Sequence, residues 1–383
     1  MKILFCVKAL STKGGGAERV LTDVANGLVE RGHDVSVLTY DKPDSRPFYS
    51  LDQRVKRTTM RIGNPDQHAK IWISLRRMVA LRRAIVKHAP EITVGVMHSM
   101  FIPMALALVG TGIPVVASEH IVPKHYENRR IQAWLLSLMP WFVHRITCIS
   151  EQVRQSYSPA LARKMVPVAN PVTIQVQNIA NVVGMPGERK VLVTAGRMDD
   201  QKDHETLIRA FGQISDKLQD WDLKIFGDGE LRNQLEKVIE SLNLQKRVFM
   251  PGITDKIADE YSKAQLFVLS SRYESFGLTT AEALLHGLPA VGFEDCQGTN
   301  LLIRHEQNGE LAKASDDSEQ RAVYLAETLY KLMSDGALRQ KYAEAAPKGI
   351  YENHGIDSVV DAWEALLSDV LSGSKGPANS TGS

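Results

Sequence analysis

Two glutamates are spaced so that they could hold the hydroxyl groups of a nucleotide and of a sugar. Glu274 and Glu282 lie eight positions apart, and the first of them follows a strand-like run at Leu266–Ser270. A carboxylate accepts several hydrogen bonds, so Glu282 could bind the vicinal hydroxyls of a ribose while Glu274 reaches the hydroxyls of a sugar. The backbone N–H groups of Gly277 and Leu278 would then face a diphosphate.

We expect Glu282 to lie on a helix that begins shortly after Glu274. Thr279 or Thr280 is the predicted cap of that helix, because a hydroxyl accepts hydrogen bonds from the free N–H groups of a first turn. A pair of glutamates at this spacing also arises by chance. The placement directly after a strand favours a binding role.

Arg197 and Lys202 form a second candidate group, just after an expected strand at Val191–Gly196. A planar guanidinium and a point charge together suit a diphosphate leaving group. Two cations at the start of a helix oppose the helix dipole, which a purely structural role has to explain. The alternative is a solvated cluster of ion pairs with the nearby acids Asp199, Asp200 and Asp203.

A glycine loop, Gly14-Gly15-Gly16-Ala17-Glu18-Arg19, follows the first strand and precedes an amphipathic helix at Ala17–Arg31. Small residues at the start of a helix let backbone N–H groups approach a phosphate or an acceptor; an ordinary tight turn is the alternative. Arg19 stands where a dinucleotide-binding fingerprint requires its last glycine. The sequence therefore disfavours a nicotinamide-dependent dehydrogenase.

Four motifs occur in a fixed order along the chain: Gly-Gly-Ala-Glu, then Gly196-Arg197 with Lys202, then Gly227-Asp228-Gly229, then Glu274-x7-Glu282-Ala-x-x-x-Gly287-x-Pro289. In this order they resemble the retaining family 4 glycosyltransferases of the GT-B fold. The resemblance is greatest to bacterial enzymes that build lipopolysaccharide, capsule or lipid-linked oligosaccharides. It covers about residues 1 to 370 and is strongest from Gly196 to Pro289.

The resemblance implies roles for particular residues. Arg197 and Lys202 would hold the donor diphosphate, Glu274 the transferred sugar and Glu282 the ribose. His120, in Ser118-Glu119-His120, would stand beside the sugar, although a strand-end histidine is also a common structural residue. Glu119 could orient its imidazole or be solvated. The implied catalytic residues are His120, Glu274, Arg197 and Lys202, and the implied donor-binding residues are Gly16, Arg197, Lys202, Val248, Phe249, Glu274, Phe276, Gly277, Leu278 and Glu282.

The resemblance also implies the reaction. A hexose or N-acetylhexosamine would move from a nucleotide diphosphate sugar, with UDP expected, to a glycan or a polyprenyl-linked glycan, with retention of configuration. The leaving diphosphate would collect the acceptor proton, so the protein supplies charge stabilisation and positioning. Ser275 and Leu301 depart from the family pattern, which usually has proline and an acidic residue there, and both fall near the expected sugar pocket.

No metal or cofactor is expected. Asp220-Trp221-Asp222 has the Asp-x-Asp form that binds metal in another class of glycosyltransferase, but it precedes the expected strand Leu223–Phe226. A metal site would lie beyond the carboxyl end of a strand. We therefore interpret the motif as a solvated turn.

Strand-like runs alternate with helical periodicity in both halves of the chain, which predicts parallel βαβ units. We expect an α/β protein of two Rossmann-like, doubly wound domains that face each other across a cleft. The domains are predicted at 1–172 and 188–355, with a linker at 175–189, a helix at about 356–371 that crosses back to the first domain, and a disordered tail at 373–383. The expected strands are Ile3–Val7, Val35–Tyr40, Ile92–Met97, Pro114–Ser118, Arg145–Ser150, Val191–Gly196, Leu223–Phe226, Val248–Met250, Leu266–Ser270 and Ala290–Phe293.

Bulk composition limits the location and the partners. The 383 residues exceed one ordinary core, and 44% hydrophobic residues, 23% charged residues and a net charge of +2 fit a soluble protein without a nucleic-acid partner. The three cysteines lie in apolar runs and are expected to be buried thiols. The start lacks the features of a signal peptide, so we expect a cytoplasmic protein.

From Arg54 to His88 ten Lys or Arg stand against one acid, Asp66. An apolar helical stripe within this segment, with the arginines elsewhere on the wheel, could lie on an anionic membrane, steer an acidic acceptor, or simply pack on the sheet. The expected stripe is Ile71, Trp72, Leu75, Met78, Val79 and Val86. Two further functions remain open: a non-hydrolysing sugar-nucleotide epimerase, and a non-enzymatic protein that binds a sugar nucleotide or a membrane surface.

Overall fold

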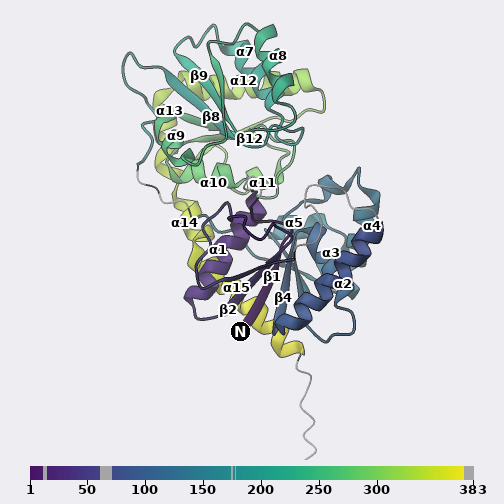
Figure 1. Cartoon of the computed structure of the whole chain (residues 1–383). Coiled ribbons are helices and arrows are strands. Elements are labelled where there is room, and N and C mark those ends of the chain that lie inside the picture. The colour runs from purple at the N-terminus through teal and green to yellow at the C-terminus, as the bar shows by residue number, and fades with distance from the viewer. Residues whose placement is uncertain (12–14, 61–70, 174–175, 177, 375–383) are drawn as a thin grey trace, which may run out of the picture. The chain divides into compact units, whose positions relative to one another are not determined.

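The computed structural model describes residues 1–11, 15–60, 71–173, 176 and 178–374. It forms two compact units. The N-terminal unit contains Met1–Thr173 and His354–Ser383, and the C-terminal unit contains Ile174–Asn353. The chain therefore leaves the first unit once and returns to it with its last helix (Figure 1).

The N-terminal unit is built on a parallel sheet with the strand order β3-β2-β1-β4-β5-β6-β7. Short apolar runs form its interior strands, which are buried from Ile3 onward in β1 and throughout β4. Buried strands of this kind need helices on both faces of the sheet. The strands are β1 (Lys2–Cys6), β2 (Asp34–Thr39), β3 (Lys56–Thr59), β4 (Ile92–Val96), β5 (Val115–Ser118), β6 (Arg145–Cys148) and β7 (Met165–Pro167).

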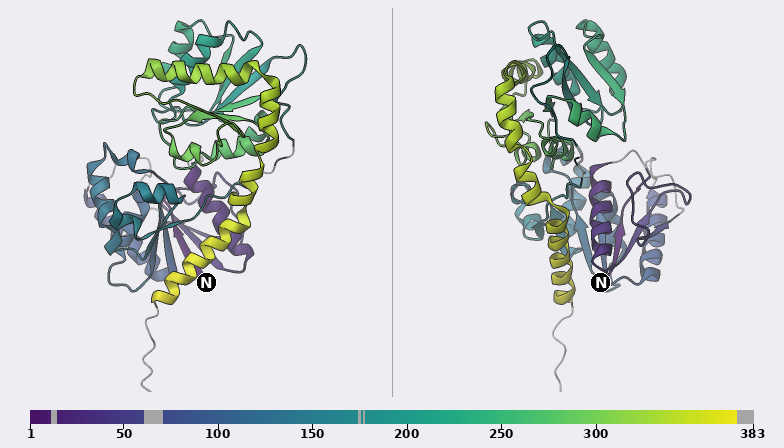
Figure 2. Two further views of the ribbon diagram at one scale, coloured as in Figure 1. Left: turned by 180° about the vertical axis from the view of Figure 1, so that it is seen from behind. Right: turned by 90° about the vertical axis from the view of Figure 1, so that its left-hand side faces the viewer.

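Helices cover both faces of this sheet. α1 packs against α15, while α2 contacts α3 and α3 contacts α4. Figure 2 shows α15 running along the unit beside α1, so the end of the chain completes the layer that its beginning started. The helices are α1 (Gly16–Glu30), α2 (Ile71–His88), α3 (His98–Ala107), α4 (Arg130–Leu138), α5 (Glu151–Ser156), α6 (Pro159–Ala162) and α15 (Ile356–Ser374), with 3-10 turns η1 (Pro123–Tyr126) and η2 (Met139–Trp141).

The C-terminal unit repeats the plan with the strand order β10-β9-β8-β11-β12-β13, again parallel. Its apolar core includes Trp221, Phe211 and Phe293, all fully buried. The strands are β8 (Lys190–Ala195), β9 (Trp221–Phe226), β10 (Val248–Gly252), β11 (Leu266–Val268), β12 (Ala290–Phe293) and β13 (Gly309–Ala312). The helices are α7 (His204–Ile214), α8 (Arg232–Ser241), α9 (Ile257–Lys263), α10 (Leu278–Leu285), α11 (Gln297–Asn300), α12 (Ser318–Ser334), α13 (Gly336–Ala345) and α14 (Lys348–His354).

The segment expected to be a linker is mostly exposed where the structure describes it, but Ala180 and Val182 anchor it to the C-terminal unit. Ala180 N donates to His286 O at 2.8 Å, and Val182 is buried. The buried guanidinium of Arg339 donates to Val182 O at 2.7 Å. Residues 180–182 therefore form part of the C-terminal unit. At the other end, α15 continues to Ser374 rather than stopping near 371, and the rest of the expected tail, 375–383, lies outside the described residues.

Strand and helix predictions agree with the structure to within a few residues where hydrophobic runs were clear. Three strands were missed: β3, β7 and β13. Each is short. β3 (Lys-Arg-Thr-Thr), at the edge of its sheet, also has no apolar residue that could have indicated a strand. The three cysteines are free and buried, as expected from their apolar surroundings.

Candidate functional site

The strand order of the C-terminal unit changes direction between β8 and β11, which are neighbours in the sheet. Ligands of open α/β sheets bind beyond the carboxyl ends of strands at such a switch point. The loop after β8 carries Arg197 and Lys202, and the loop after β11 carries Glu274. The fold thus brings these sequence-predicted residues to one place.

Lys202 and Glu274 form an ion pair there. Lys202 Nζ lies 2.5 Å from Glu274 Oε1, and the two side chains are 16% and 9% exposed. The same carboxylate oxygen accepts a hydrogen bond from Ser271 Oγ at 2.9 Å. The pair is therefore held in place before any ligand arrives.

Further contacts join the two loops around this pair. Arg272 N donates to Gln201 O at 2.9 Å, and Ser270 Oγ donates to Lys202 O at 2.9 Å. Gln201 Nε2 donates to Tyr273 O at 3.0 Å. These contacts fix the backbone on both sides of Lys202, so the position of its ammonium group follows from the loop as well as from Glu274.

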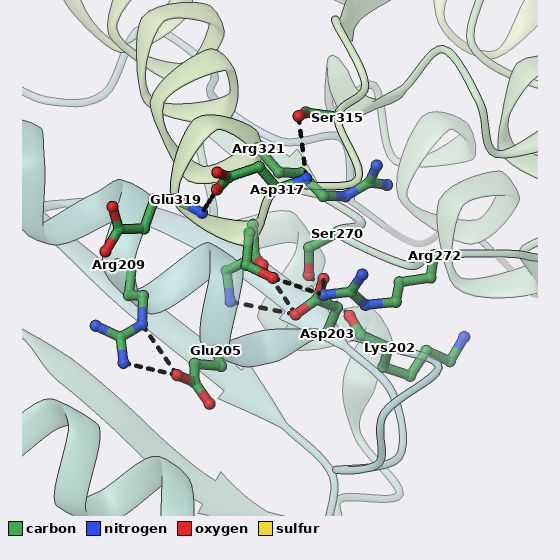
Figure 3. A network of polar contacts seen from close by, with 12 residues as sticks. Lys202, Asp203, Glu205, Arg209, Ser270, Arg272, Ser315, Asp317, Glu319 and Arg321 are labelled. Atoms are coloured by element: carbon green, nitrogen blue, oxygen red, sulfur yellow. Dashed lines mark hydrogen bonds and ion pairs between the residues drawn. The ribbon is translucent and has the colours of Figure 1, made fainter.

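Asp203 holds the start of α7 and a second ion pair. Its φ of 48° is left-handed, and as the helix N-cap its Oδ1 accepts a hydrogen bond from Thr206 N at 3.4 Å and another from Thr206 Oγ1 at 2.9 Å. Oδ2 lies 3.0 Å from Arg272 Nη2 (Figure 3). The solvated acidic cluster considered as an alternative is wrong for Asp203, because this carboxylate is buried and paired with Arg272.

Arg197 differs from Lys202 in its surroundings. Its side chain is 71% exposed, and its Nη1 lies 3.7 Å from Asp199 Oδ2. His204, which sequence analysis did not single out, lies buried against the backbone of Gly196 and Arg197. Burial and, to a lesser degree, the nearby Lys202 charge lower the pKa of His204 to about 4. A neutral imidazole therefore supports the loop that carries the exposed arginine.

Helix α10 begins at Leu278, directly after Gly277 in a left-handed conformation with φ 80°. The expected threonine cap is wrong: Gly277 is the N-cap and no side chain caps the helix, because Thr279 and Thr280 already lie inside the first turn. The N–H groups of this turn face away from the helix and can meet an anion. Glu282 lies one turn further on and is 3% exposed.

Phe276 is 1% exposed, so its side chain belongs to the interior and only its backbone could face a ligand. At the sheet edge, Val248 is buried, whereas Phe249 is 40% exposed on β10. Leu278 is half-buried. Among the residues predicted to bind the donor, these positions offer backbone groups and one exposed ring.

Gly227 explains why glycine recurs after β9. A Cβ at this position would lie 2.0 Å from Gly196 O, and the backbone φ is 129°. The neighbouring Met198 N donates to Asp228 O at 3.1 Å. The Gly227-Asp228-Gly229 turn thus packs backbone to backbone on the loop that leads to Arg197, which no larger residue permits.

In the N-terminal unit, His120 follows β5 and Gly16 begins α1 after β1. His120 Nε2 lies 2.9 Å from Ser118 Oγ, which also accepts a hydrogen bond from Thr147 Oγ1 at 3.1 Å. Burial lowers the pKa of His120 to about 4. Gly16 is exposed at the helix start, while Gly14 lies outside the described residues.

Glu119 is buried, so the interpretation that it is solvated is wrong. Its Oε1 accepts hydrogen bonds from the backbone N–H groups of His120 at 2.9 Å and Ile121 at 3.0 Å, and Oε2 accepts one from Tyr126 Oη at 2.7 Å. Burial outweighs these contacts and raises the pKa of Glu119 to about 7. The carboxylate therefore shapes the backbone around His120.

His98, after the neighbouring strand β4, was missed by sequence reasoning. It is buried, and its ring lies 5.9 Å from that of His125 and 5.3 Å from that of Tyr126. Met97 before it has φ 69°, a conformation uncommon for a side chain of this size. The only sequence signal was a histidine at a strand end.

The Asp220-Trp221-Asp222 motif is held by ion pairs. Asp222 lies within β9 and pairs with Arg189 at 2.6 Å, and Asp220 pairs with Lys190 at 2.5 Å. Asp222 is buried, so the expected solvated turn is wrong for this residue, although the motif does stand at the amino end of the strand. Within the described residues no group of three or more His, Cys, Asp or Glu is arranged to hold a metal ion.

Two doubly wound parallel sheets, with a cation and a carboxylate paired at the switch point of the second, define a two-domain α/β protein. Family models agree with this division. Residues 14–175 match the model described as Glycosyltransferase Family 4, and residues 175–349 match Glycosyl transferases group 1.

Individual proteins resemble the chain over nearly its whole length. An uncharacterized glycosyltransferase of Haemophilus influenzae is 25% identical over 357 residues, covering 92% of this chain and 96% of the relative. A Campylobacter jejuni enzyme, named as an alpha-1,4-N-acetyl-D-galactosaminyltransferase acting on a diNAcBac-PP-undecaprenol-linked glycan, is 25% identical over 372 residues, covering 97% and 99%. The structure of Anabaena HepE with UDP and glucose aligns with a TM-score of 0.79 at 20% identity, covering 96% of this chain and 99% of that one.

The chain is a glycosyltransferase with the GT-B fold, composed of a family 4-like domain followed by a group 1 domain. The predictions of two doubly wound α/β domains and of a glycosyltransferase are thereby confirmed. Both matching family models describe transferases, which does not favour the epimerase or the non-enzymatic interpretation.

Proposed function

We propose that this glycosyltransferase transfers a hexose or an N-acetylhexosamine from a UDP-sugar to a glycan or lipid-linked glycan, with retention of anomeric configuration. The observation that carries the proposal is the Lys202–Glu274 pair at the switch point, beside the start of α10. A cation for the diphosphate and a carboxylate for a sugar stand 2.5 Å apart. A sugar diphosphate would use both groups, the cation for its phosphates and the carboxylate for its hydroxyls.

Each group has a distinct task in this proposal. Lys202 and the exposed guanidinium of Arg197 neutralise the charge that develops on the leaving diphosphate, and the N–H groups at Gly277 and Leu278 add to this stabilisation. Glu274 accepts hydrogen bonds from the sugar, and Glu282 from the ribose. The nucleobase would contact the backbone at Val248 and Phe249.

Retention is proposed with the leaving diphosphate as the acceptor of the proton from the attacking hydroxyl, so that no protein nucleophile is required. His120 would position the sugar as a neutral imidazole, since its pKa is about 4. Gly16, at the start of α1, would contact a phosphate of the donor. No metal enters the scheme.

The acceptor class is proposed from the Campylobacter jejuni relative, whose name specifies a glycan on diphosphoundecaprenol. Such an acceptor lies in a membrane, and we propose that the enzyme works as a peripheral protein on the cytoplasmic face. None of the helices that the structure describes has the length and apolar character of a membrane span.

A thermal-shift panel of UDP, GDP, ADP and their sugar conjugates tests the donor. A ligand at about 100 times its dissociation constant stabilises the folded state by about 2.7 kcal/mol. We expect stabilisation by UDP and UDP-sugars that is absent in Lys202→Ala. A response to GDP or ADP alone would replace UDP in the proposal, and no response to any nucleotide would reject the diphosphate site. Proton NMR of the product made from a donor that stabilises the protein then gives the anomeric configuration of the transferred sugar. The same configuration as in the donor supports retention.

A further inference from the structure

A helix on the N-terminal unit exposes an apolar stripe. Ile131, Trp134 and Trp141 are 75%, 61% and 74% exposed. The first two lie on α4, and Trp141 ends η2, which continues α4 without a break. Spacings of three and seven residues place them along one side of this helical segment. Soluble proteins seldom leave two tryptophans of one helix in water.

Basic residues flank the stripe in the sequence. From Lys124 to Arg145 there are four Lys or Arg and one acid, Glu127, and of these Arg145 pairs with Asp369 on α15 at 3.1 Å. Arg129 and Arg130 are exposed at the start of α4. The surface therefore combines tryptophan with positive charge, which is the composition of helices that lie in the interface of an anionic bilayer.

The outer side of α2 extends the same character. The alternative that the apolar stripe of this helix packs on the sheet fails at Val79 and Val86, which are 51% and 48% exposed. Leu81 and Ile85 face the core instead, and the side chains of 71–75 lie outside the described residues. The two exposed valines alternate with exposed cations at helical spacing, and α3 joins α2 to α4 (Figure 1). The exposed cations are Arg76, Arg83 and Lys87.

Other basic residues of the same segment are already used within the protein. Arg57 pairs with the buried Asp41 at 2.7 Å, and Lys56 pairs with Asp34 at 2.9 Å. Arg82 donates to Ala107 O at 2.6 Å at the end of α3. The charge available to a partner is therefore concentrated on the outer side of α2 and at the start of α4, next to the tryptophans.

We propose that the outer surface of α4 and η2, formed by Ile131, Trp134 and Trp141, is a membrane-docking surface that inserts into the headgroup region of anionic phospholipid, with the α2 cations contacting lipid phosphates. The indoles enter the interface and the arginines and Lys87 remain at the phosphates. This inference deepens the proposed function, because a lipid-linked acceptor is reached at the bilayer surface. A second copy of the chain is the competing occupant; in a twofold dimer this positive surface would face its own copy, which like charge disfavours.

Vesicle sedimentation of the full chain tests the surface, without any donor. Vesicles of phosphatidylcholine alone are compared with vesicles that also contain phosphatidylglycerol. We expect the wild type to bind the mixed vesicles. The double variant Trp134→Ser/Trp141→Ser should lose about tenfold or more in vesicle affinity, because the two indoles that enter the bilayer contribute most of the apolar transfer. Tyr330→Ser, at an exposed aromatic residue of α12 in the other unit, is the matched control and should bind like the wild type.

A charge variant separates the two contributions. Arg83→Ser/Lys87→Ser should weaken binding to the mixed vesicles. The remaining binding should depend less steeply on salt concentration than that of the wild type, since fewer lipid phosphates are contacted. Wild-type protein that ignores phosphatidylglycerol, or a tryptophan double variant that binds like the wild type, would overturn the proposal. A wild type that sediments as a dimer and a tryptophan double variant that sediments as a monomer would also overturn it, because the tryptophans would then contact a second copy of the chain.

The UDP thermal shift, measured without vesicles, keeps this test separate from the proposed function. We expect the tryptophan double variant to retain the wild-type shift. A wild-type protein that binds mixed vesicles but shows no nucleotide response would reject the donor proposal and leave the docking surface standing.

Discussion

Lys202 Nζ and Glu274 Oε1 lie 2.5 Å apart although 72 positions separate the residues in sequence. The two charges are expected to contact different parts of one donor, a diphosphate and a sugar. Without donor the two groups neutralise each other's charge. The carboxylate then holds the ammonium group in position, and the ammonium group offsets the cost of burying the charged carboxylate. Donor binding therefore exchanges one ion pair for contacts to both groups.

Lys202→Ala should reduce both activity and stability. The negative charge that develops on the leaving diphosphate loses the lysine that neutralises it, so kcat/KM should fall about 10²-fold or more. The substitution also leaves Glu274 without its cation, which typically costs about 3–5 kcal/mol for a buried pair. Kinetics with the supported UDP-sugar and urea unfolding measure the two effects. The double variant Lys202→Ala/Glu274→Gln should recover stability but not activity, and strictly additive stability losses would argue against the coupling.

Arg197→Ala should separate these properties. Its guanidinium is 71% exposed and lies 3.7 Å from Asp199, so its removal should change the free energy of unfolding by less than about 0.5 kcal/mol. We expect kcat/KM to fall about 10²-fold, because the charge acts on the leaving diphosphate. A large stability loss, or near-normal activity, would reject this role. Arg209→Ala, an exposed arginine on α7, serves as the control.

Asp203→Asn should be milder than Asp203→Ala. Asparagine tolerates left-handed φ and can still accept the hydrogen bond from Thr206, so it loses mainly the ion pair with Arg272. Alanine loses the cap as well, which costs about 1 kcal/mol, and meets the left-handed backbone at a further cost of about 1–2 kcal/mol. Urea unfolding should rank wild type, Asn and Ala in that order. If Asn and Ala were equally unstable, the cap and the backbone would not be the source of the difference.

Gly227→Ala should disrupt the donor site through the backbone. The added Cβ would stand 2.0 Å from Gly196 O, so the loop that leads to Arg197 must move. We expect a folded but destabilised protein with a greatly reduced thermal response to UDP. Gly212→Ala, where a Cβ meets only side chains at 3.4 Å, is the matched control on α7. An unchanged UDP response in Gly227→Ala would show that the turn does not shape the site.

Stability should decline on acidification between pH 6.5 and about 4. His98 and His120 have an ordinary pKa of 6.5, and burial lowers the pKa of each to about 4. His125 and Arg129 also disfavour charge on His98. The unfolded chain therefore binds more protons than the folded one in this window, and folding stability is lost as the pH falls through it.

His98→Asn should make that decline shallower. The measurement is the urea midpoint of the wild type and the variant across the window, with an unchanged far-ultraviolet circular dichroism spectrum as evidence of folding. An identical pH dependence in both proteins would exclude His98 as one of the titrating groups.

Sequence patterns were sufficient for elements whose signal is local. The apolar runs of β1 and β4 and the amphipathic pattern of α1 depend on neighbouring residues only, and these elements were predicted within a few residues. Edge strand β3 was not, because pairing with β2 rather than its own hydrophobicity makes Lys-Arg-Thr-Thr a strand. The prediction of a threonine cap was wrong for a similar reason. The left-handed backbone of Gly277 makes it the N-cap, so α10 begins at Leu278 and both threonines lie inside the helix.

The sequence by itself determined the residue types, the order of the motifs and the alternation of strand and helix, and from these the fold class and the glycosyltransferase activity followed. Only the tertiary structure decided which of those residues touch. Lys202 meets Glu274 because β8 and β11 are neighbours at the point where the strand order reverses, and that order depends on how whole helices cover the sheet. Exposure was decided in the same way: a periodic apolar stripe shows that a helix has an apolar side, but only packing shows whether that side faces a core, as at Leu81 and Ile85, or solvent, as at Trp134 and Trp141.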